Sequence, residues 1–407
     1  MSAAGSVHEA ADVRRTIVDS GVDVEHPEFA GRPDLSLLNA QEPAGIGGEH
    51  GTSVASVIGA PVNGIGVVGI YPQAVLRSWD AALGEGTRLE SADIAAGILA
   101  AARSGRGVIN LSLGGDRDLP IELAVSEAVA TGSLVVAASG NDGTRGSPIG
   151  YPAALPHVTT VAATDRSGGV APFSSRSPYV DVAAPGDDIL VASALGKNWH
   201  PSSGTSFSSP IVTGAAAWLW TARPDLGDLS GVEIIRRSAR DIDQAGRDPA
   251  SGFGMLNVQS ALALPTPIRD PYEPNDDVDE VSPVGDRNLR KAPPLTTVTR
   301  RASSIDGRVD AWEDPRDVFR VWLPAGRRVT FRLSGTADGD LSLHRASAQT
   351  VAGRFTATGR LAQANARGRA ERLVYVNRGA GRWAYLTVRL PARTSDTTYR
   401  LTAASRA

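Results

Sequence analysis

The spacing of hydrophobic and polar positions changes near residue 264, and this change divides the chain. Before it, short β-branched apolar runs alternate with helical patterns, and Gly, Asp or Ser residues bound runs such as 16–18, 108–111, 134–138 and 158–162. Continuous apolar runs are typical of parallel strands buried on both faces, and their alternation with helices favours an α/β fold. We therefore expect residues 1–264 to form a parallel sheet with helices on both faces.

Two of the expected helices have recognisable ends. Ile94 and Ile98 share one face of a helical pattern that Gly105 ends. Ser230 and Glu233 have the spacing of a capping box ahead of two isoleucines, which predicts a helix N-terminus at Ser230.

A different pattern follows residue 264. Residues 265–304 are rich in Pro, Asp and Arg, and the stretch 270–280 has few apolar residues to bury. We expect a linker or acidic loop there that leads into a second domain. From residue 305 apolar and polar residues alternate, as in Val329, Phe331 and Leu333 with polar residues between them. This period predicts a smaller all-β sandwich over 305–407, with one polar face on each antiparallel sheet.

Composition narrows the classes of function. The 407 residues include no cysteine, which excludes disulfides, thiolate zinc sites and a cysteine nucleophile. The net charge is −3. From residue 265 onward the chain has 24 basic and 16 acidic side chains, whereas the part before it has 17 basic and 28 acidic ones. This contrast in charge supports a domain boundary near residue 265. Because the arginines are scattered along the chain, we expect no nucleic-acid partner.

Signals for membrane insertion and export are not recognised in the sequence. No stretch reaches the roughly 18 consecutive apolar residues of a membrane span, so we expect no transmembrane segment. The first fifteen residues lack a charged region followed by an apolar one, so we expect no signal peptide in this chain.

Three short motifs stand where expected strands meet expected helices, the edge at which an open α/β sheet usually builds its site. Asp19 follows an apolar run, His50 leads an apolar helical pattern, and Ser206 lies at a helix start. These residue types supply the three roles of nucleophilic acyl transfer: Ser206 attacks a carbonyl, His50 accepts its proton, and Asp19 orients the imidazole. Asn141, just past a buried run, adds an amide donor for the negative oxygen.

Each of these residues also has a purely structural interpretation. An Asp after a strand is often a turn residue, a His before a helix is often a surface group, and a Ser at a helix start is often an N-cap. The occurrence of all four at element edges, in the order Asp, His, Asn, Ser, favours the catalytic interpretation.

The segments that carry these residues resemble those of the subtilisin-like serine peptidases. IVDSGVDVEHPEF resembles the family's Asp motif, HGTSVASVIGA its His motif and SGTSFSSPIVTGAAA its Ser motif, while VINLSLGG and VVAASGNDG resemble its substrate-binding and oxyanion segments. The resemblance covers about residues 13–264. It implies a secreted serine endopeptidase that acts on proteins or peptides, with Asp19, His50 and Ser206 as its triad and Asn141 in its oxyanion hole.

The resemblance also implies how a substrate binds. The positions involved are Ser112, Leu113 and Gly114 on one wall of a pocket, Ala138, Ser139 and Gly140 on the other, and Gly150 at the bottom. With no side chain at Gly150, we expect broad cleavage after large apolar residues such as Phe, Tyr, Leu or Met. A plain turn at Gly150 is the alternative, and Asp142 near the rim would add tolerance for Lys or Arg.

A structural calcium ion is implied as well, although the chemistry itself requires no cofactor. The implied ligands are oxygen atoms, which calcium prefers: the side chains of Glu28 and Asn63 and the carbonyls of Pro61, Ile65 and Val67. The alternative is a plain Asn-Gly turn at Asn63.

The second domain resembles, more loosely, the bacterial pre-peptidase C-terminal domain in its YEPNDD opening and its ADGDLSL turn. Its acidic and amide side chains either bind calcium or form a solvated loop; they are Glu273, Asn275, Asp276, Asp277, Asp338 and Asp340.

Two other functions are alternatives to peptidase activity. An esterase on an α/β-hydrolase fold requires Gly-x-Ser-x-Gly and the order Ser, Asp, His, neither of which the sequence has. A non-catalytic relative that only binds peptides stays open because only 18 residues precede Asp19, fewer than the family usually has. We expect the protein to be a monomer.

Overall fold

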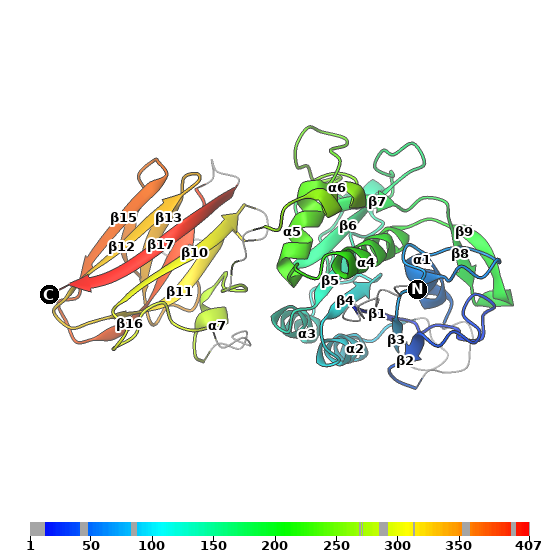
Figure 1. The fold of residues 1–407 in the computed structure, drawn as a ribbon, viewed down its shortest axis with the longest axis horizontal. Helices are drawn as coiled ribbons and strands as arrows, with labels where there is room; N and C mark the ends of the chain where they lie inside the picture. The colour runs from blue at the N-terminus through cyan, green and yellow to red at the C-terminus, as the bar shows by residue number, and fades with distance from the viewer. Residues whose placement is uncertain are drawn as a thin grey trace, which may run out of the picture. The chain divides into compact units, whose positions relative to one another are not determined.

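The computed structural model describes residues 13–40, 48–82, 88–267, 270, 272–284, 292–311, 314–351, 359–391 and 396–406. The chain forms two compact units, Met1–Pro267 and Ile268–Ala407 (Figure 1). The N-terminal fifteen residues, on which the signal-peptide prediction rests, lie largely outside the described residues. Among the described helices, none has the length and apolar character needed to cross a membrane.

A seven-stranded sheet forms the centre of the first unit, with strand order β2-β3-β1-β4-β5-β6-β7. Every neighbouring pair is parallel. The strands are β1 (Arg14–Asp19), β2 (Leu35–Leu37), β3 (Leu76–Asp80), β4 (Gly107–Leu111), β5 (Leu134–Ala138), β6 (Val158–Thr164) and β7 (Val182–Pro185). β4 and β5 are buried at every position, as their continuous apolar runs require. The prediction of a parallel α/β sheet is confirmed.

Helices cover both faces of this sheet, as predicted. They are α1 (Glu49–Gly59), α2 (Ser91–Arg103), α3 (Leu119–Ala130), α4 (Thr205–Ala222), α5 (Asp228–Ser238) and α6 (Val258–Ala263). Successive strand residues point to opposite faces, so Ile109 of β4 packs in the core under α2 and α3, whereas Val108 packs in the core under α4 and α5. Helix α5 begins at Asp228 after an N-cap at Gly227, so the predicted start at Ser230 was wrong.

A two-stranded antiparallel hairpin fixes the position of α1. It consists of β8 (Ile189–Ser193) and β9 (Asn198–Ser202). Ser53 on α1 donates a hydrogen bond to the carbonyl of Ala192 at 2.7 Å. At the start of α1, the Glu49 carboxylate accepts hydrogen bonds from Ser193 Oγ and from the Leu195 amide, each at 2.7 Å. The first turn of α1 is therefore tied to the hairpin.

The second unit contains two four-stranded antiparallel sheets, with orders β10-β17-β12-β15 and β11-β16-β13-β14 (Figure 1). The strands are β10 (Ala302–Asp310), β11 (Arg316–Leu323), β12 (Arg328–Gly335), β13 (Asp340–Arg345), β14 (Arg360–Ala364), β15 (Ala370–Val376), β16 (Arg382–Arg389) and β17 (Asp396–Arg406). Val329, Phe331 and Leu333 point into a shared core, and the residues between them face outward. The alternating pattern thus forms an all-β domain, as predicted.

The acidic stretch 270–280 is not the solvated loop that its composition suggested. Its end forms the short helix α7 (Val278–Val281), whose two valines are buried. Glu273 is 5% exposed and Asn275 is fully buried. The Asn275 carbonyl accepts a hydrogen bond from the Val318 amide at 2.7 Å, so the stretch packs against β11. Residues 270 and 272–281 therefore belong to the folded second unit.

Candidate active site

Asp19 and His50 form a carboxylate–imidazole pair in which the carboxylate is buried and the imidazole is 41% exposed. Asp19 ends β1 and is 1% exposed, and its Oδ1 accepts a hydrogen bond from the Ser20 amide at 2.7 Å. His50, the second residue of α1, approaches it with Nδ1 at 2.8 Å from Oδ1 and 3.0 Å from Oδ2. The negative charge of Asp19 raises the pKa of His50, although burial of the ring acts in the opposite direction. With Nδ1 held by the carboxylate, Nε2 is left for proton transfer.

Ser206 occupies the first turn of α4, next to the histidine. Gly204 precedes the helix with φ of 158°, in a conformation that side chains rarely adopt. The ring of Phe207, the next residue, lies 6.0 Å from the ring of His50. Within the described residues no hydrogen bond joins Ser206 to His50; Ser206 Oγ instead lies 3.4 Å from the Ser112 carbonyl. The nucleophile candidate and the base candidate therefore belong to the same site.

The side-chain amide of Asn141 is oriented by the turn that carries Ser206. Its Oδ1 accepts hydrogen bonds from the Thr205 amide at 2.9 Å and from Thr205 Oγ1 at 3.0 Å. Since the oxygen is fixed on this side, the Nδ2 group points the other way, and it has no acceptor among the described residues. An amide N–H held beside a serine at a helix N-terminus can stabilise an oxyanion.

A cavity of about 490 Å³ opens beside Ser206 and Asn141. The structure brings all seven predicted substrate-binding residues together in its lining: Ser112, Leu113, Gly114, Ala138, Ser139, Gly140 and Gly150. Its two walls follow β4 and β5, which are neighbours in the sheet. At Gly150 a Cβ atom would meet nothing within 4 Å, so the glycine leaves open space. The geometry can accommodate a large side chain.

Several residues that line the cavity were not predicted from the sequence. They include Asp116, Pro148, Ile149, Tyr151, Ser175 and Thr205. Tyr151 directly follows Gly150, and its backbone pairs with Gly115 through two hydrogen bonds of 2.9 and 3.0 Å. At the rim, Asp142 forms an ion pair with Arg145 at 2.5 Å, so its charge is partly compensated within the chain. Asp142 and Arg145 are three residues apart, and this spacing is the sequence feature from which the ion pair could have been predicted.

A buried polar network lies behind the nucleophile. Asn110 Nδ2 donates to Ser112 Oγ at 2.9 Å, and Ser112 Oγ donates to the Ser206 carbonyl at 2.9 Å. Thr213 Oγ1 donates to Asn110 Oδ1 at 2.9 Å from two turns further along α4. The network ties the end of β4 to the first turns of α4, so it fixes where Ser206 lies.

The residues of the implied calcium site are near one another, but some of their oxygens already have partners. Glu28 is 1% exposed, and its Oε2 accepts a hydrogen bond from Trp199 Nε1 at 2.8 Å. Burial raises the pKa of Glu28, while hydrogen bonds from Trp199 and the Val67 amide lower it. Asn63 Oδ1 accepts from the Ile65 amide at 3.1 Å. Glu28 Oε1 is the one buried side-chain oxygen here without a partner among the described residues.

Another group of oxygen ligands lies in the second unit. Carboxylate oxygens of Asp270, Glu273 and Asp317 lie within 4.8 Å of one another. Asp317 is fully buried; one of its oxygens accepts a hydrogen bond from the Tyr399 hydroxyl, and Oδ1 has no partner among the described residues. Burial raises the pKa of each of these three carboxyl groups, that of Asp270 to about 6. Hard oxygen ligands gathered in this way fit a calcium ion.

Comparisons with known proteins match the first unit. The model of the subtilase family matches residues 13–254. Subtilisin E of Bacillus subtilis (strain 168) is 34% identical over 259 residues, which cover 62% of this chain and just under two thirds (66%) of that protein. Subtilisin DY of Bacillus licheniformis is 35% identical over 258 residues, covering 62% of this chain and 92% of that protein.

Solved structures agree. The self-cleaved protease domain of PatA superposes with a TM-score of 0.55 at 34% identity, covering 62% of this chain and 95% of that one. For the fold alone, the psychrophilic subtilisin-like protease Apa1 of the Antarctic psychrotroph Pseudoalteromonas sp. AS-11 has a TM-score of 0.58 at 20% identity, covering 62% and 93% of the two chains. Because the family model spans more than half of its residues, the chain belongs to the subtilase family of serine endopeptidases.

Proposed function

We propose that the chain hydrolyses internal peptide bonds of proteins with Asp19, His50 and Ser206 as its triad. The observation that carries the proposal is the pair of hydrogen bonds from His50 Nδ1 to Asp19, formed beside the turn that holds Ser206. Ser206 Oγ attacks the carbonyl carbon of the substrate while His50 Nε2 accepts the hydroxyl proton. His50 then returns that proton to the leaving amine, and water completes hydrolysis of the acyl-enzyme by the reverse sequence.

The negative oxygen of the tetrahedral intermediate is stabilised by Asn141 Nδ2 and the Ser206 amide. Support comes from the orientation of the Asn141 side chain, whose Oδ1 is held by Thr205. Donors fixed before the reaction stabilise developing charge without reorganisation. Replacement of Asn141 by Ala should therefore lower kcat by about 10²–10³-fold with little change in KM, a magnitude taken from the relative subtilisin.

The residue before the cleaved bond occupies the cavity beside Ser206, and large apolar residues are preferred there. The open space at Gly150 and the volume of about 490 Å³ support this preference. Substitution of Gly150 by Val should narrow the cavity and move cleavage from Phe and Tyr toward smaller residues. Profiling of cleavage sites in a peptide mixture tests this, and cleavage mainly after Asp or Glu would contradict it.

The first test of the activity is labelling of the full chain with a fluorophosphonate probe, which reacts with an activated serine. Labelling of the native protein and its loss in Ser206→Ala is the expected result. The matched control is Ser208→Ala, since Ser208 is a buried serine of the same helix that lies outside the proposed triad. A folded native protein that is not labelled would contradict the proposed triad and favour the peptide-binding alternative.

A calcium ion in the second unit is the second proposal, and it concerns stability rather than chemistry. It rests on the cluster of Asp270, Glu273 and Asp317, and on the buried oxygens Asp317 Oδ1 and Asn275 Oδ1, which have no partner among the described residues. The ion would offset the mutual repulsion of these carboxylates, which take no part in hydrolysis. The site predicted at Glu28 stays a prediction of the same kind for the first unit.

The cellular location and the oligomeric state of the protein are also part of the proposal. We expect the protein to act outside the cell, as its resemblance to the subtilisin-like peptidases implies, and to be a monomer. The scattered arginines argue against a nucleic-acid partner. Fractionation of the producing cells tests the location, and sedimentation of the purified chain tests the oligomeric state.

A further inference from the structure

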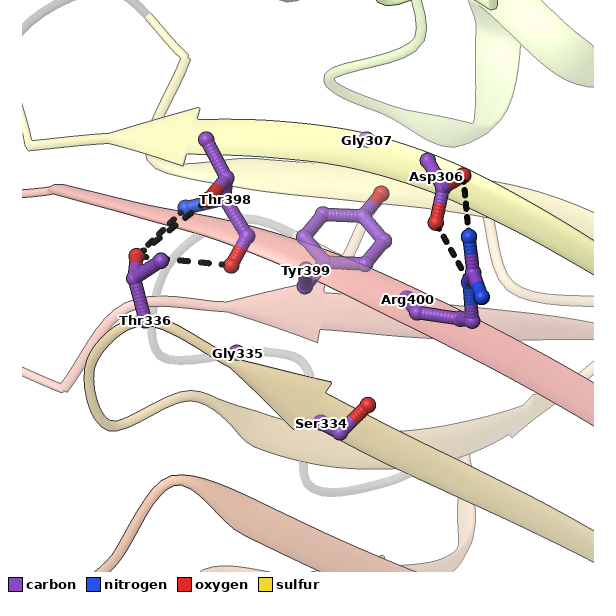
Figure 2. Close-up of a pocket in the computed structure, with 8 residues that line it drawn as sticks. All are labelled: Asp306, Gly307, Ser334, Gly335, Thr336, Thr398, Tyr399 and Arg400. Carbon is purple, nitrogen blue, oxygen red and sulfur yellow. Dashed lines mark hydrogen bonds and ion pairs between the residues drawn. The ribbon is translucent and has the colours of Figure 1, made fainter.

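The outer face of the sheet β10-β17-β12-β15 is divided by charge. On β10 and β17, Arg400 and Asp306 form a two-point ion pair, with Nε 2.7 Å from Oδ1 and Nη2 2.9 Å from Oδ2 (Figure 2). Next to this pair lies a hollow of about 470 Å³, which hydroxyl groups of Ser334, Thr336 and Thr398 help to line. The charges of Arg400 and Asp306 therefore compensate each other.

Three arginines on β12 and β15 occupy the other half, and we call Arg328, Arg332 and Arg372 the arginine strip. All three are exposed. The strand register sets Arg332 directly opposite Arg372. None of the three forms an ion pair within the part of the chain that the structure describes. The outward positions of the two strands include no acidic residue; they are Arg328, Thr330, Arg332, Ser334, Ala370, Arg372, Val374 and Val376.

This arrangement is unfavourable in the free protein. Residues directly opposite on antiparallel strands have Cβ atoms about 4.5–5.5 Å apart, and like charges there are destabilising. A carboxylate bound between Arg332 and Arg372 would remove the repulsion. Guanidinium groups bind carboxylates through two parallel hydrogen bonds, so the pair is chemically suited to this ligand.

We propose that the arginine strip binds an acidic, partly apolar stretch of extended polypeptide in the protein substrates of this enzyme. The proposal rests on the peptidase function proposed above and adds a substrate class to it. Arg328 and Arg332 lie four residues apart, about 13 Å along the strand, and carboxylates four residues apart in an extended peptide have the same spacing. An acidic strand lying along β12 would therefore meet both arginines.

Two further observations favour a polypeptide over a nucleic acid. Val374 and Val376, 39% and 42% exposed, lie beside the arginines on β15 and offer apolar contacts to side chains between the carboxylates. The outward positions of β12 and β15 hold no aromatic side chain on which bases could stack. A mixed acidic and apolar segment uses both kinds of contact, whereas a phosphate backbone uses only the charges.

Binding can be measured without cleavage in the full-length Ser206→Ala variant. The probe is a fluorescein-labelled twelve-residue peptide of alternating Glu and Val, followed by fluorescence anisotropy at low and at moderate salt. The test variant adds Arg332→Gln and Arg372→Gln. The matched control adds Arg345→Gln and Arg360→Gln instead, which remove the same charge from exposed positions on the other sheet.

The expected result is a Kd at least tenfold higher for the strip variant and within about twofold of the parent for the control. Salt should weaken binding by the parent more than by the strip variant, because screening acts on the charges that were removed. Equal losses in both variants, equal binding by the strip variant, or binding of a single-stranded oligonucleotide in place of the peptide would overturn the proposal. Cleavage of a short neutral peptide by the active chain tests the peptidase function separately.

Discussion

Two sets of buried carboxylates, one in each unit, have different neighbours. In the first unit, Asp19 faces His50 at 2.8 Å, and Asp181 faces Arg236 at 3.0 Å with both side chains at most 5% exposed. In the second unit, carboxylate oxygens of Asp270, Glu273 and Asp317 instead gather within 4.8 Å of one another.

The difference lies in the source of the compensating charge. Side chains of the polypeptide supply it for the first set, whereas protons or ions from solution would supply it for the second. A buried carboxylate is stable when the chain places a cation or several N–H groups against it. Carboxylates that gather close to one another repel each other, and protons or a metal ion relieve that repulsion. The two pairs of the first unit should therefore depend on side chains of the chain itself, and the cluster of the second unit on the ionic composition of its surroundings.

The largest expected effect comes from breaking the pair of the first unit at the active site. Asp19→Asn keeps the size of the side chain but presents an amide to His50 Nδ1, which favours the wrong tautomer of the imidazole. We expect kcat to fall by about 10⁴-fold with a nearly unchanged KM. Steady-state kinetics on a short peptide provide the measurement, with the exposed Asp34→Asn as control. Activity within tenfold of the native enzyme would remove Asp19 from the triad.

The buried pair Asp181–Arg236 tests the same rule through stability. Arg236→Ala leaves the carboxylate of Asp181 with a hydrogen bond from the Thr160 amide but without its cation. We expect the first unit to lose about 3–5 kcal/mol of unfolding free energy, since a buried charge is then uncompensated. Denaturant unfolding measures the loss, and Arg400→Ala, which breaks an exposed pair, should leave stability almost unchanged. Comparable effects of the two substitutions would show that burial does not decide the outcome.

The sequence predicted the parts of the fold and site that depend on local patterns. The runs that became β4 and β5 are buried throughout, and the pocket walls follow because residues 112–114 and 138–140 stand at the ends of these strands. The motif residues Asp19, His50 and Ser206 lie at element ends for the same reason.

What the sequence did not predict depends on contacts between distant segments. The stretch 270–280 has few apolar residues, yet Asn275 is buried because its backbone and side chain bond to Val318, 43 residues away. The link from Glu49 to the β8–β9 hairpin joins residues 144 and 146 positions apart. Helix α5 starts at Asp228 because Gly227, rather than the predicted Ser230, occupies its N-cap.

Calcium should raise the unfolding temperature of the second unit and so separate its thermal transition from that of the first unit. With calcium in about 100-fold excess over its Kd, the second unit should gain about 2.7 kcal/mol, and EDTA should remove this gain. Calorimetry of the full chain in calcium and in EDTA measures the shift of each transition. In Asp317→Asn the calcium-dependent shift should shrink strongly, while Asp306→Asn on the exposed face should retain it. Unchanged transitions in EDTA would mean that the carboxylates of the second unit are compensated by protons instead.

The smallest expected effect comes from Glu49, which adds a second negative charge beside the proposed catalytic pair of Asp19 and His50. Asp19 contributes most to the raised pKa of His50, and Glu49 contributes less in the same direction. His50 acts as a base only when it is neutral, so kcat/KM rises with pH through this raised pKa. Glu49→Gln should lower the pKa of His50 and so move the acidic side of the profile of kcat/KM against pH, its acid limb, to lower pH. On that side of the profile we expect kcat/KM to rise by about a few-fold at most.

Glu49 also accepts hydrogen bonds from Ser193 and Leu195, so the charge must be separated from the anchoring of the hairpin. Gln keeps one acceptor oxygen, whereas Ala removes the charge and both acceptors. If the charge tunes His50, both variants move the acid limb, and only Glu49→Ala lowers kcat at every pH because the first turn of α1 loses its anchor. A profile that stays in place in Glu49→Gln would show that Asp19 alone sets the pKa of the base, and that the carboxylate at position 49 acts only as a tie to the hairpin.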